Sequence, residues 1–169
     1  MRIVKLAIIS VVVLFLLATV FSLLLPSQVI ISRAIDIYAS KEKVYTIVNE
    51  PEKWKFWIEN RDSLAVSIST QQQKTFILGT TKAWILTSTP NQVNTNWQVG
   101  KGQVIPAEFN FVEQAGSDYI TLQWKFVQKV KWYPWEKFAS IVSDKILGQF
   151  MEASLDNLKR LAEQQVEKE

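Results

Sequence analysis

The stretch ISRAIDIYASKEKVYTIVNEPEKWKFWIEN, residues 31–60, decides the fold that this sequence predicts. Its first residues belong to a strand from Gln28 to Tyr38, in which alternate positions are β-branched. The apolar positions on one face are Val29, Ile31, Ile35 and Ile37. Arg33 falls on the same face and is the exception among them. The sequence therefore predicts a strand with one apolar face, interrupted by a single charge.

Two short helices are predicted directly after this strand. Ser40 is a favourable N-cap for the segment KEKVYTIVN, whose apolar residues Val44, Ile47 and Val48 recur at helical spacing. Pro51 suits the first turn of a second helix, in the segment EKWKFWIEN. The chain thus returns from its first strand through two helices before any further strand begins.

The rest of the sequence predicts about six short strands and then one long helix. Alternating apolar segments follow one another through residues 64–126, and turn residues such as Pro90 and Asn91 separate them. Short connections between consecutive strands predict a mostly antiparallel sheet. Apolar residues recur at helical spacing from about Trp135 to about Val166. The fold class that we expect is α+β, with a curved antiparallel sheet around a long C-terminal helix.

The aromatic residues of the strands are the candidate binding residues. If the strand registers are as the alternation suggests, six of them face inward, and three residues of the helices approach the same space. The full candidate set is Tyr45, Trp84, Trp97, Phe109, Phe111, Trp124, Phe126, Phe138 and Phe150. The alternative is that these side chains only fill the core, and a register shift of one residue turns a side chain outward.

The N-terminal segment from Leu6 to Leu25 is 20 consecutive residues without a charge. At about 1.5 Å per residue, a helix of this length spans the hydrocarbon core of a bilayer. We expect an uncleaved anchor at residues 1–27 and one domain at residues 28–169. The alternative is a cleaved signal peptide, although its apolar region is usually shorter and a small-residue cleavage pattern is missing here. Arg2 and Lys5 predict a cytoplasmic N-terminus and an extracytoplasmic domain.

Composition excludes several classes of function. The chain has no Cys and no His, which removes thiol nucleophiles, histidine-based triads, disulfides and the usual zinc and haem ligation. The net charge of +3 includes Arg2 and Lys5 before the apolar segment, so the domain has no basic stripe typical of a nucleic-acid binder. Four carboxylates are candidate acid or base groups, and none has a partner at a spacing typical of a catalytic pair: Asp36, Glu108, Glu113 and Asp118. We predict no catalytic residue, no metal and no cofactor.

Two local aromatic clusters have two interpretations. The first cluster comprises Trp54, Phe56 and Trp57, and the second comprises Trp132, Tyr133 and Trp135. Trp and Tyr favour membrane interfaces, so a closely tethered domain can rest them on lipid headgroups. The alternative is that they pack the short helices and the start of the long helix against the sheet.

The order of elements resembles the helix-grip fold of the SRPBCC superfamily, which includes the START-like proteins and the polyketide cyclase/dehydrase family. The quoted opening is similar to that family's, with Asn49, Pro51, Trp54 and Trp57 in an Asn-x-Pro-x-x-Trp-x-x-Trp pattern. The ending GQFMEASLDNLKRLAEQ is similar to the family's terminal helix. Membrane-anchored bacterial members look much like this chain overall.

The resemblance implies a hydrophobic cavity between sheet and long helix, but no shared catalytic signature. Our first hypothesis is a membrane-tethered binding module for a hydrophobic or lipid-like small molecule. The second is a cyclase-type enzyme with polar groups in the cavity. The third is a non-catalytic interaction domain with a filled core, whose partner is unknown.

Overall fold

The computed structural model describes residues 2–24, 26–59, 66–69 and 74–164, without the side chains of residues 66–69, Phe138, Ile141 and Ser143. The helices are α1 (Arg2–Leu24), α2 (Lys41–Asn49), α3 (Pro51–Trp57) and α4 (Pro134–Gln164). The strands are β1 (Gln28–Ile37), β2 (Val66–Ser69), β3 (Thr75–Leu78), β4 (Thr81–Thr89), β5 (Gln92–Val99), β6 (Val104–Glu113) and β7 (Ile120–Lys129).

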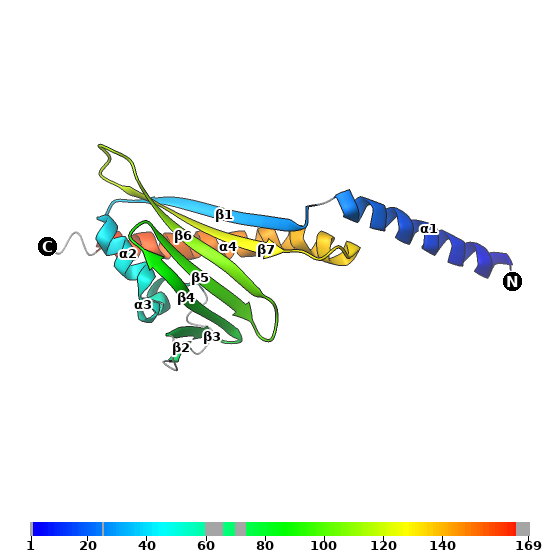
Figure 1. Ribbon diagram of the computed structural model, residues 1–169, viewed down its shortest axis with the longest axis horizontal. Helices are drawn as coiled ribbons and strands as arrows, with labels where there is room; N and C mark the ends of the chain where they lie inside the picture. The colour runs from blue at the N-terminus through cyan, green and yellow to red at the C-terminus, as the bar shows by residue number, and fades with distance from the viewer. Residues whose placement is uncertain (1, 25, 60–65, 70–73, 165–169) are drawn as a thin grey trace.

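The strands form one antiparallel sheet in the order β1-β7-β6-β5-β4-β3-β2. The first strand of the chain therefore pairs with the last, from Gln28 opposite Lys129 to Ile37 opposite Ile120. Helices α2 and α3 carry the chain from β1 at one edge to β2 at the other, and α4 runs along the inner side of the sheet (Figure 1). The expected α+β helix-grip architecture is confirmed.

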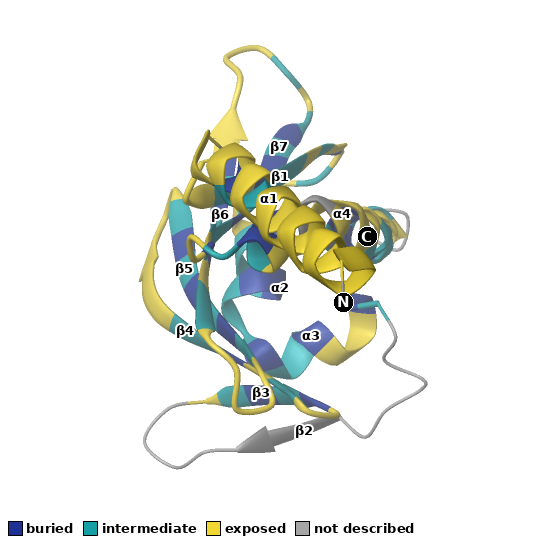
Figure 2. Cartoon of the chain, turned by 90° about the vertical axis from the view of Figure 1, so that its right-hand side faces the viewer, coloured by how far each residue is buried: buried dark blue, intermediate teal, exposed yellow. Residues whose placement is uncertain are grey.

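The core lies between the inner face of the sheet and the helices. Helix α4 contributes Met151, Leu155 and Leu158, all of them buried, and Figure 2 shows the buried stretches of β5, α2 and α3 facing one another. Full burial of an aliphatic side chain contributes about 1.5–3 kcal/mol to folding. Helix α4 therefore depends on its C-terminal half for most of its attachment to the core.

Helix α1 extends away from the sheet and is exposed along most of its length, except near its C-terminal end, where Ser22 is buried (Figures 1 and 2). Its mean hydropathy is 2.9 over a window of which 6% is buried, so it is long and apolar enough to cross a membrane. A signal sequence has the same properties. The helix is continuous from Arg2 to Leu24, and Pro26 lies beyond its end as expected.

Hydrogen bonds attach the C-terminal end of α1 and the following residues Pro26 and Ser27 to the β7–α4 connection and to the first turn of α4. Ser22 Oγ donates to the carbonyl of Trp132 at 2.7 Å. The buried Lys137 Nζ donates to the carbonyl of Pro26 at 2.5 Å, and Val130 N–H donates to the carbonyl of Ser27 at 2.9 Å. Pro26 and Ser27, which lead into β1, are therefore held against the domain.

The inward orientation expected for Trp84 is wrong. The register places Ala83 on the inner face, opposite Phe76 on β3 and Trp97 on β5. Trp84 points to the other face, beside Asn96. The rings of Phe76 and Trp97 take the inner space on both sides of β4, so a small residue fits between them. A register irregularity after Ile85 then reverses the alternation in the second half of the strand.

Candidate functional site

The inner face of the sheet is aromatic over three consecutive strands, β5, β6 and β7. Trp97 comes from β5, Phe109 and Phe111 from β6, and Trp124 and Phe126 from β7. All five are buried, with at most 5% of each side chain exposed. The alternation in these strands places the large rings on one face and polar residues such as Asn110 and Gln123 on the other. These five candidates therefore face inward together.

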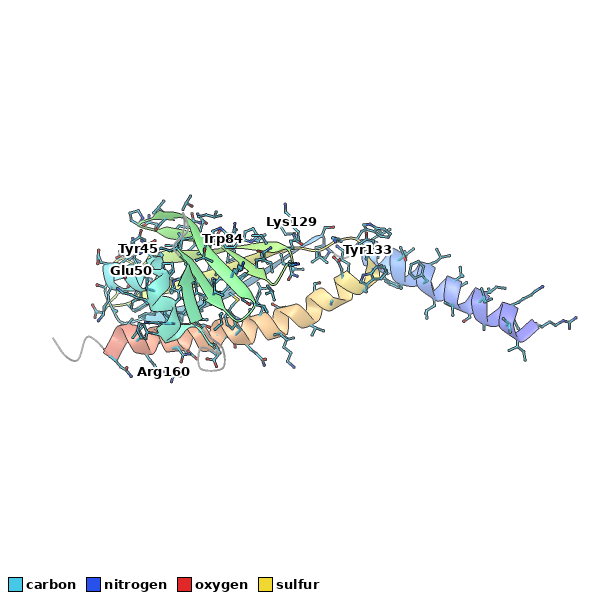
Figure 3. The ribbon with its side chains drawn as sticks, turned by 90° about the horizontal axis from the view of Figure 1, so that it is seen from below. Tyr45, Glu50, Trp84, Lys129, Tyr133 and Arg160 are labelled. Carbon is cyan, nitrogen blue, oxygen red and sulfur yellow. The ribbon has the colours of Figure 1, made fainter. Side chains whose placement is uncertain are left out.

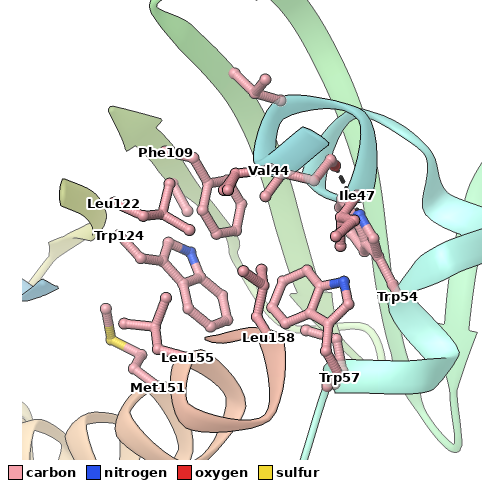
Figure 4. Packing of buried hydrophobic residues seen from close by; sticks show 14 of the residues in the cluster. Val44, Ile47, Trp54, Trp57, Phe109, Leu122, Trp124, Met151, Leu155 and Leu158 are labelled. Atoms are coloured by element: carbon pink, nitrogen blue, oxygen red, sulfur yellow. Dashed lines mark hydrogen bonds between the residues drawn. The ribbon is translucent and has the colours of Figure 1, made fainter. Parts of the chain in front are cut away.

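Trp124 lies at the centre of this aromatic interior (Figure 4). Its ring stacks on Phe109 with a centroid distance of 4.8 Å, and Phe126 lies 5.2 Å away. Trp97 and Phe150 lie 5.6 and 5.9 Å from it. At such distances aromatic rings are in direct contact. Side chains therefore fill the space around Trp124.

Helix α3 adds two indoles that were not among the candidate lining residues. Trp54 stacks on Trp97 at 5.6 Å with an interplanar angle of 2°, and Trp57 meets Trp124 edge to face at 5.9 Å. Both are completely buried, whereas Phe56 between them is exposed. The packing alternative is thus correct for Trp54 and Trp57. Their spacing of three residues, which places both on one face of a helix, was the signal in the sequence.

Two indole N–H groups of this interior have no acceptor among the described residues. Trp57 Nε1 and Trp124 Nε1 are both buried and unpaired. Trp54 Nε1, by contrast, donates to the carbonyl of Val48 at 2.8 Å, and Trp97 Nε1 donates to Thr95 Oγ1 at 3.1 Å. Buried tryptophans usually satisfy this donor. The site therefore presents two free donors within an apolar surrounding.

The remaining candidates border this interior. Tyr45 is half-buried on α2, with its ring 5.6 Å from Phe111 and its hydroxyl 2.6 Å from Ser88 Oγ. Phe150 is half-buried on α4. The side chain of Phe138 lies outside the described residues.

The four carboxylates considered as candidate acid or base groups lie away from the aromatic interior. Glu108 is on the outer face and pairs with Lys125 at 2.5 Å, and Asp36 is exposed and accepts a hydrogen bond from Thr121 at 2.6 Å. Glu113 and Asp118 line an open polar pocket of about 420 Å³ at the β6–β7 turn. Within the described ranges, no group of three Asp, Glu, His or Cys side chains is placed to hold a metal ion.

Several solved protein structures are similar to the fold of this chain. The di-domain ARO/CYC protein StfQ from the steffimycin biosynthetic pathway matches 82% of this chain with a TM-score of 0.61 at 13% identity, over 52% of its own length. A START superfamily protein from Mycobacterium smegmatis matches 80% of this chain and 97% of its own at 19% identity, with a TM-score of 0.59. The chain has the helix-grip fold.

A synthase is similar to the same extent. Truncated norcoclaurine synthase from Thalictrum flavum matches 79% of this chain and 92% of its own at 17% identity, with a TM-score of 0.58. No protein-family model and no curated protein matches the chain. The helix-grip comparisons therefore establish the fold, because identities this low do not carry an activity from one protein to another.

Proposed function

We propose that this protein is a membrane-tethered binding module for a hydrophobic or lipid-like molecule with at least one hydrogen-bond acceptor. Residues 1–27 anchor it, with the N-terminus in the cytoplasm, and residues 28–169 form the binding domain on the other side. The observation that carries the proposal is the pair of buried, unpaired indole donors of Trp57 and Trp124.

The proposal follows from the cost of a buried donor without an acceptor. Such a group loses about 1–3 kcal/mol relative to one that is paired. A carbonyl, ester or hydroxyl oxygen of a ligand recovers this free energy, and its apolar part exchanges water for the surrounding rings. The ligand thus needs both an apolar body and an acceptor, as fatty acids and other amphipathic molecules have.

Binding requires a side chain to move, because rings surround Trp124. Phe150 is the candidate gate. It is half-buried, whereas Trp97, Phe109 and Phe126 are buried, and its ring contacts both Trp97 and Trp124. Rotation of Phe150 away from these rings opens a space beside the Trp124 indole without a change in the sheet.

Two alternatives remain as competing hypotheses. A cyclase-type enzyme needs polar groups in the interior with displaced pKa values. The buried side-chain atoms without a hydrogen-bond partner among the described residues are the indole N–H groups of Trp57 and Trp124, which do not titrate at accessible pH, and Oε2 of Glu52, whose other carboxylate oxygen pairs with Lys74. An interaction domain with a filled core agrees with the ring contacts around Trp124 but leaves its unpaired donor without a role. A binding module accounts both for the ring contacts around Trp124 and for the unpaired donors.

The test uses full-length protein extracted in a mild detergent. Native mass spectrometry should show a co-purifying apolar molecule. Tryptophan fluorescence should then report binding of a long-chain methyl ketone about tenfold tighter than of the alkane of equal length, the ratio expected for one hydrogen bond.

Trp124→Phe removes one of the two unpaired donors and should weaken the preference for the ketone, and the double variant Trp57→Phe/Trp124→Phe, which removes both, should abolish it. Trp54→Phe is the matched control, because the Trp54 donor is already bonded within the protein. Absence of any bound or added ligand, or an unchanged preference in the double variant, would overturn the proposal.

A further inference from the structure

The N-terminal half of α4 carries an exposed apolar stripe. Trp135, Val142 and Ile146 are 61%, 59% and 65% exposed. Together with Ala139 and Phe150 they recur at helical spacing along one side of the helix, over about 22 Å at 1.5 Å per residue. We call these five residues the α4 stripe. Exposed apolar surface that is continuous rather than scattered marks a site of interaction.

The N-terminal end of the stripe, at Trp135, lies close to the end of α1. Trp135 stacks on Tyr133 at 5.0 Å, and Tyr133 contacts Trp132, whose carbonyl accepts the hydrogen bond from Ser22 of α1. Figure 3 shows Tyr133 at this junction. Where α1 spans a bilayer, these aromatic residues lie at the level of the membrane surface, the position that Trp and Tyr favour.

The other end of the stripe reaches the aromatic interior. Phe150 follows Ile146 by one turn, and its ring lies 6.3 Å from Trp97 and 5.9 Å from Trp124. Trp124 carries one of the two unpaired donors. A single apolar path on one helix therefore connects the membrane end of the domain with the proposed binding site.

We infer that the α4 stripe guides the acyl chain of a membrane lipid between the bilayer and the aromatic interior. This inference rests on the proposed function and specifies the source of its ligand. A second copy of the chain fits the stripe less well, because a stable interface engages about 20–30 residues a side, whereas the stripe consists of only five residues and is one side chain wide. One acyl chain matches that width.

The first experiment measures where lipid chains touch the protein. The chain contains no Cys, so one bimane label can be placed through Ile146→Cys or, as control, Val112→Cys on β6. Val112 is 53% exposed and lies outside the stripe. In phosphatidylcholine vesicles, brominated acyl chains should quench the label at position 146 several-fold more strongly than the label at position 112. Equal quenching at the two positions would refute the inference.

The second experiment measures transfer. Uptake of a fluorescent fatty acid from phosphatidylcholine vesicles into the full-length protein is followed by energy transfer from tryptophan. Ile146→Glu places a charge in the path and should slow uptake about tenfold, whereas Val112→Glu should leave the rate unchanged. Both positions are exposed, so both variants should fold. Equal rates for the two variants would overturn the inference.

The two proposals fail in different ways. If no fatty acid binds in detergent, the proposed function fails. If it binds equally well in detergent to wild type and Ile146→Glu, and vesicle uptake is also equal, only the stripe is refuted. Efficient disulfide formation between Ile146→Cys copies at low protein-to-lipid ratio would assign the stripe to self-association and would equally overturn its role as a lipid path.

Discussion

Arg33 lies beneath Gly148, where the long helix crosses the first strand. The Arg33 side chain points to the inner face, its Nε donates to Glu152 Oε1 at 2.6 Å, and its Nη1 donates to the carbonyl of Ser32 at 2.9 Å. A Cβ atom at position 148 would overlap the guanidinium group. The glycine thus allows α4 to close over the charge that interrupts the apolar face of β1.

The close approach predicts an unusual response to Gly148→Ala. In an ordinary helix interior this change stabilises by about 1 kcal/mol. Here the added methyl group displaces Arg33 and breaks its pairing with Glu152, so we expect little or no gain in the wild type. In an Arg33→Ala background the full gain should return. Chemical denaturation in detergent measures the coupling, and equal gains in both backgrounds would contradict it.

The two classes of buried indole predict different costs for Trp→Phe. Trp54→Phe leaves the carbonyl of Val48 without its donor, and this unpaired group adds about 1–3 kcal/mol to the loss of packing. Trp124→Phe removes a donor that has no partner among the described residues. We therefore expect Trp54→Phe to lower the free energy of unfolding more than Trp124→Phe. Thermal unfolding of ligand-free protein compares them, and the reverse order would contradict the assignment of the donors.

The attachment of α1 to the domain predicts an effect of Lys137→Met on orientation. Lys137 Nζ donates to the carbonyl of Pro26 and to Ser27 Oγ, and a charged hydrogen bond contributes about 1.5–3 kcal/mol. Without them the domain should move more freely relative to α1. Nitroxide labels at Val11→Cys and Val112→Cys should give a broader distance distribution by pulsed electron paramagnetic resonance. The exposed Lys101→Met should not broaden it, and a wild-type distribution in Lys137→Met would show that other contacts hold the tether.

The Glu108–Lys125 pair predicts an acid-dependent stability. Burial alone raises the pKa of the Glu108 carboxyl, but hydrogen bonds from Lys125 and Asn110 outweigh it, and the pKa lies below its ordinary value of 4.5. A carboxyl with a lowered pKa in the folded state stabilises above the unfolded value, and this stabilisation is lost as the pH falls through the folded value.

Wild type should therefore be more stable than Glu108→Gln at pH 7, and the difference should shrink below pH 4.5. Melting temperatures at a series of pH values measure it, with Glu42→Gln on the exposed side of α2 as control. A difference that stays constant down to the lowest pH would show that the pair contributes through packing rather than charge.

Part of the candidate site was predictable from sequence. The alternation in β5, β6 and β7 correctly placed Trp97, Phe109 and Trp124 on the inner face, because the opposite face of these strands is polar. It failed for Trp84, because β4 has apolar residues on both faces, and only the rings of the neighbouring strands decide which face takes the smaller residue. The role of these aromatic residues in binding a ligand stays a prediction.

The sequence by itself determined the order of elements, the apolar N-terminal helix and the long C-terminal helix. These follow from local periodicity, which needs no knowledge of distant partners. Only the tertiary structure decided that Arg33 fits beneath Gly148, that the donors of Trp57 and Trp124 lack acceptors, and that the α4 stripe joins α1 to the aromatic interior. Each of these depends on which residues, far apart in the chain, lie opposite one another after the strands have paired and α4 has packed against them.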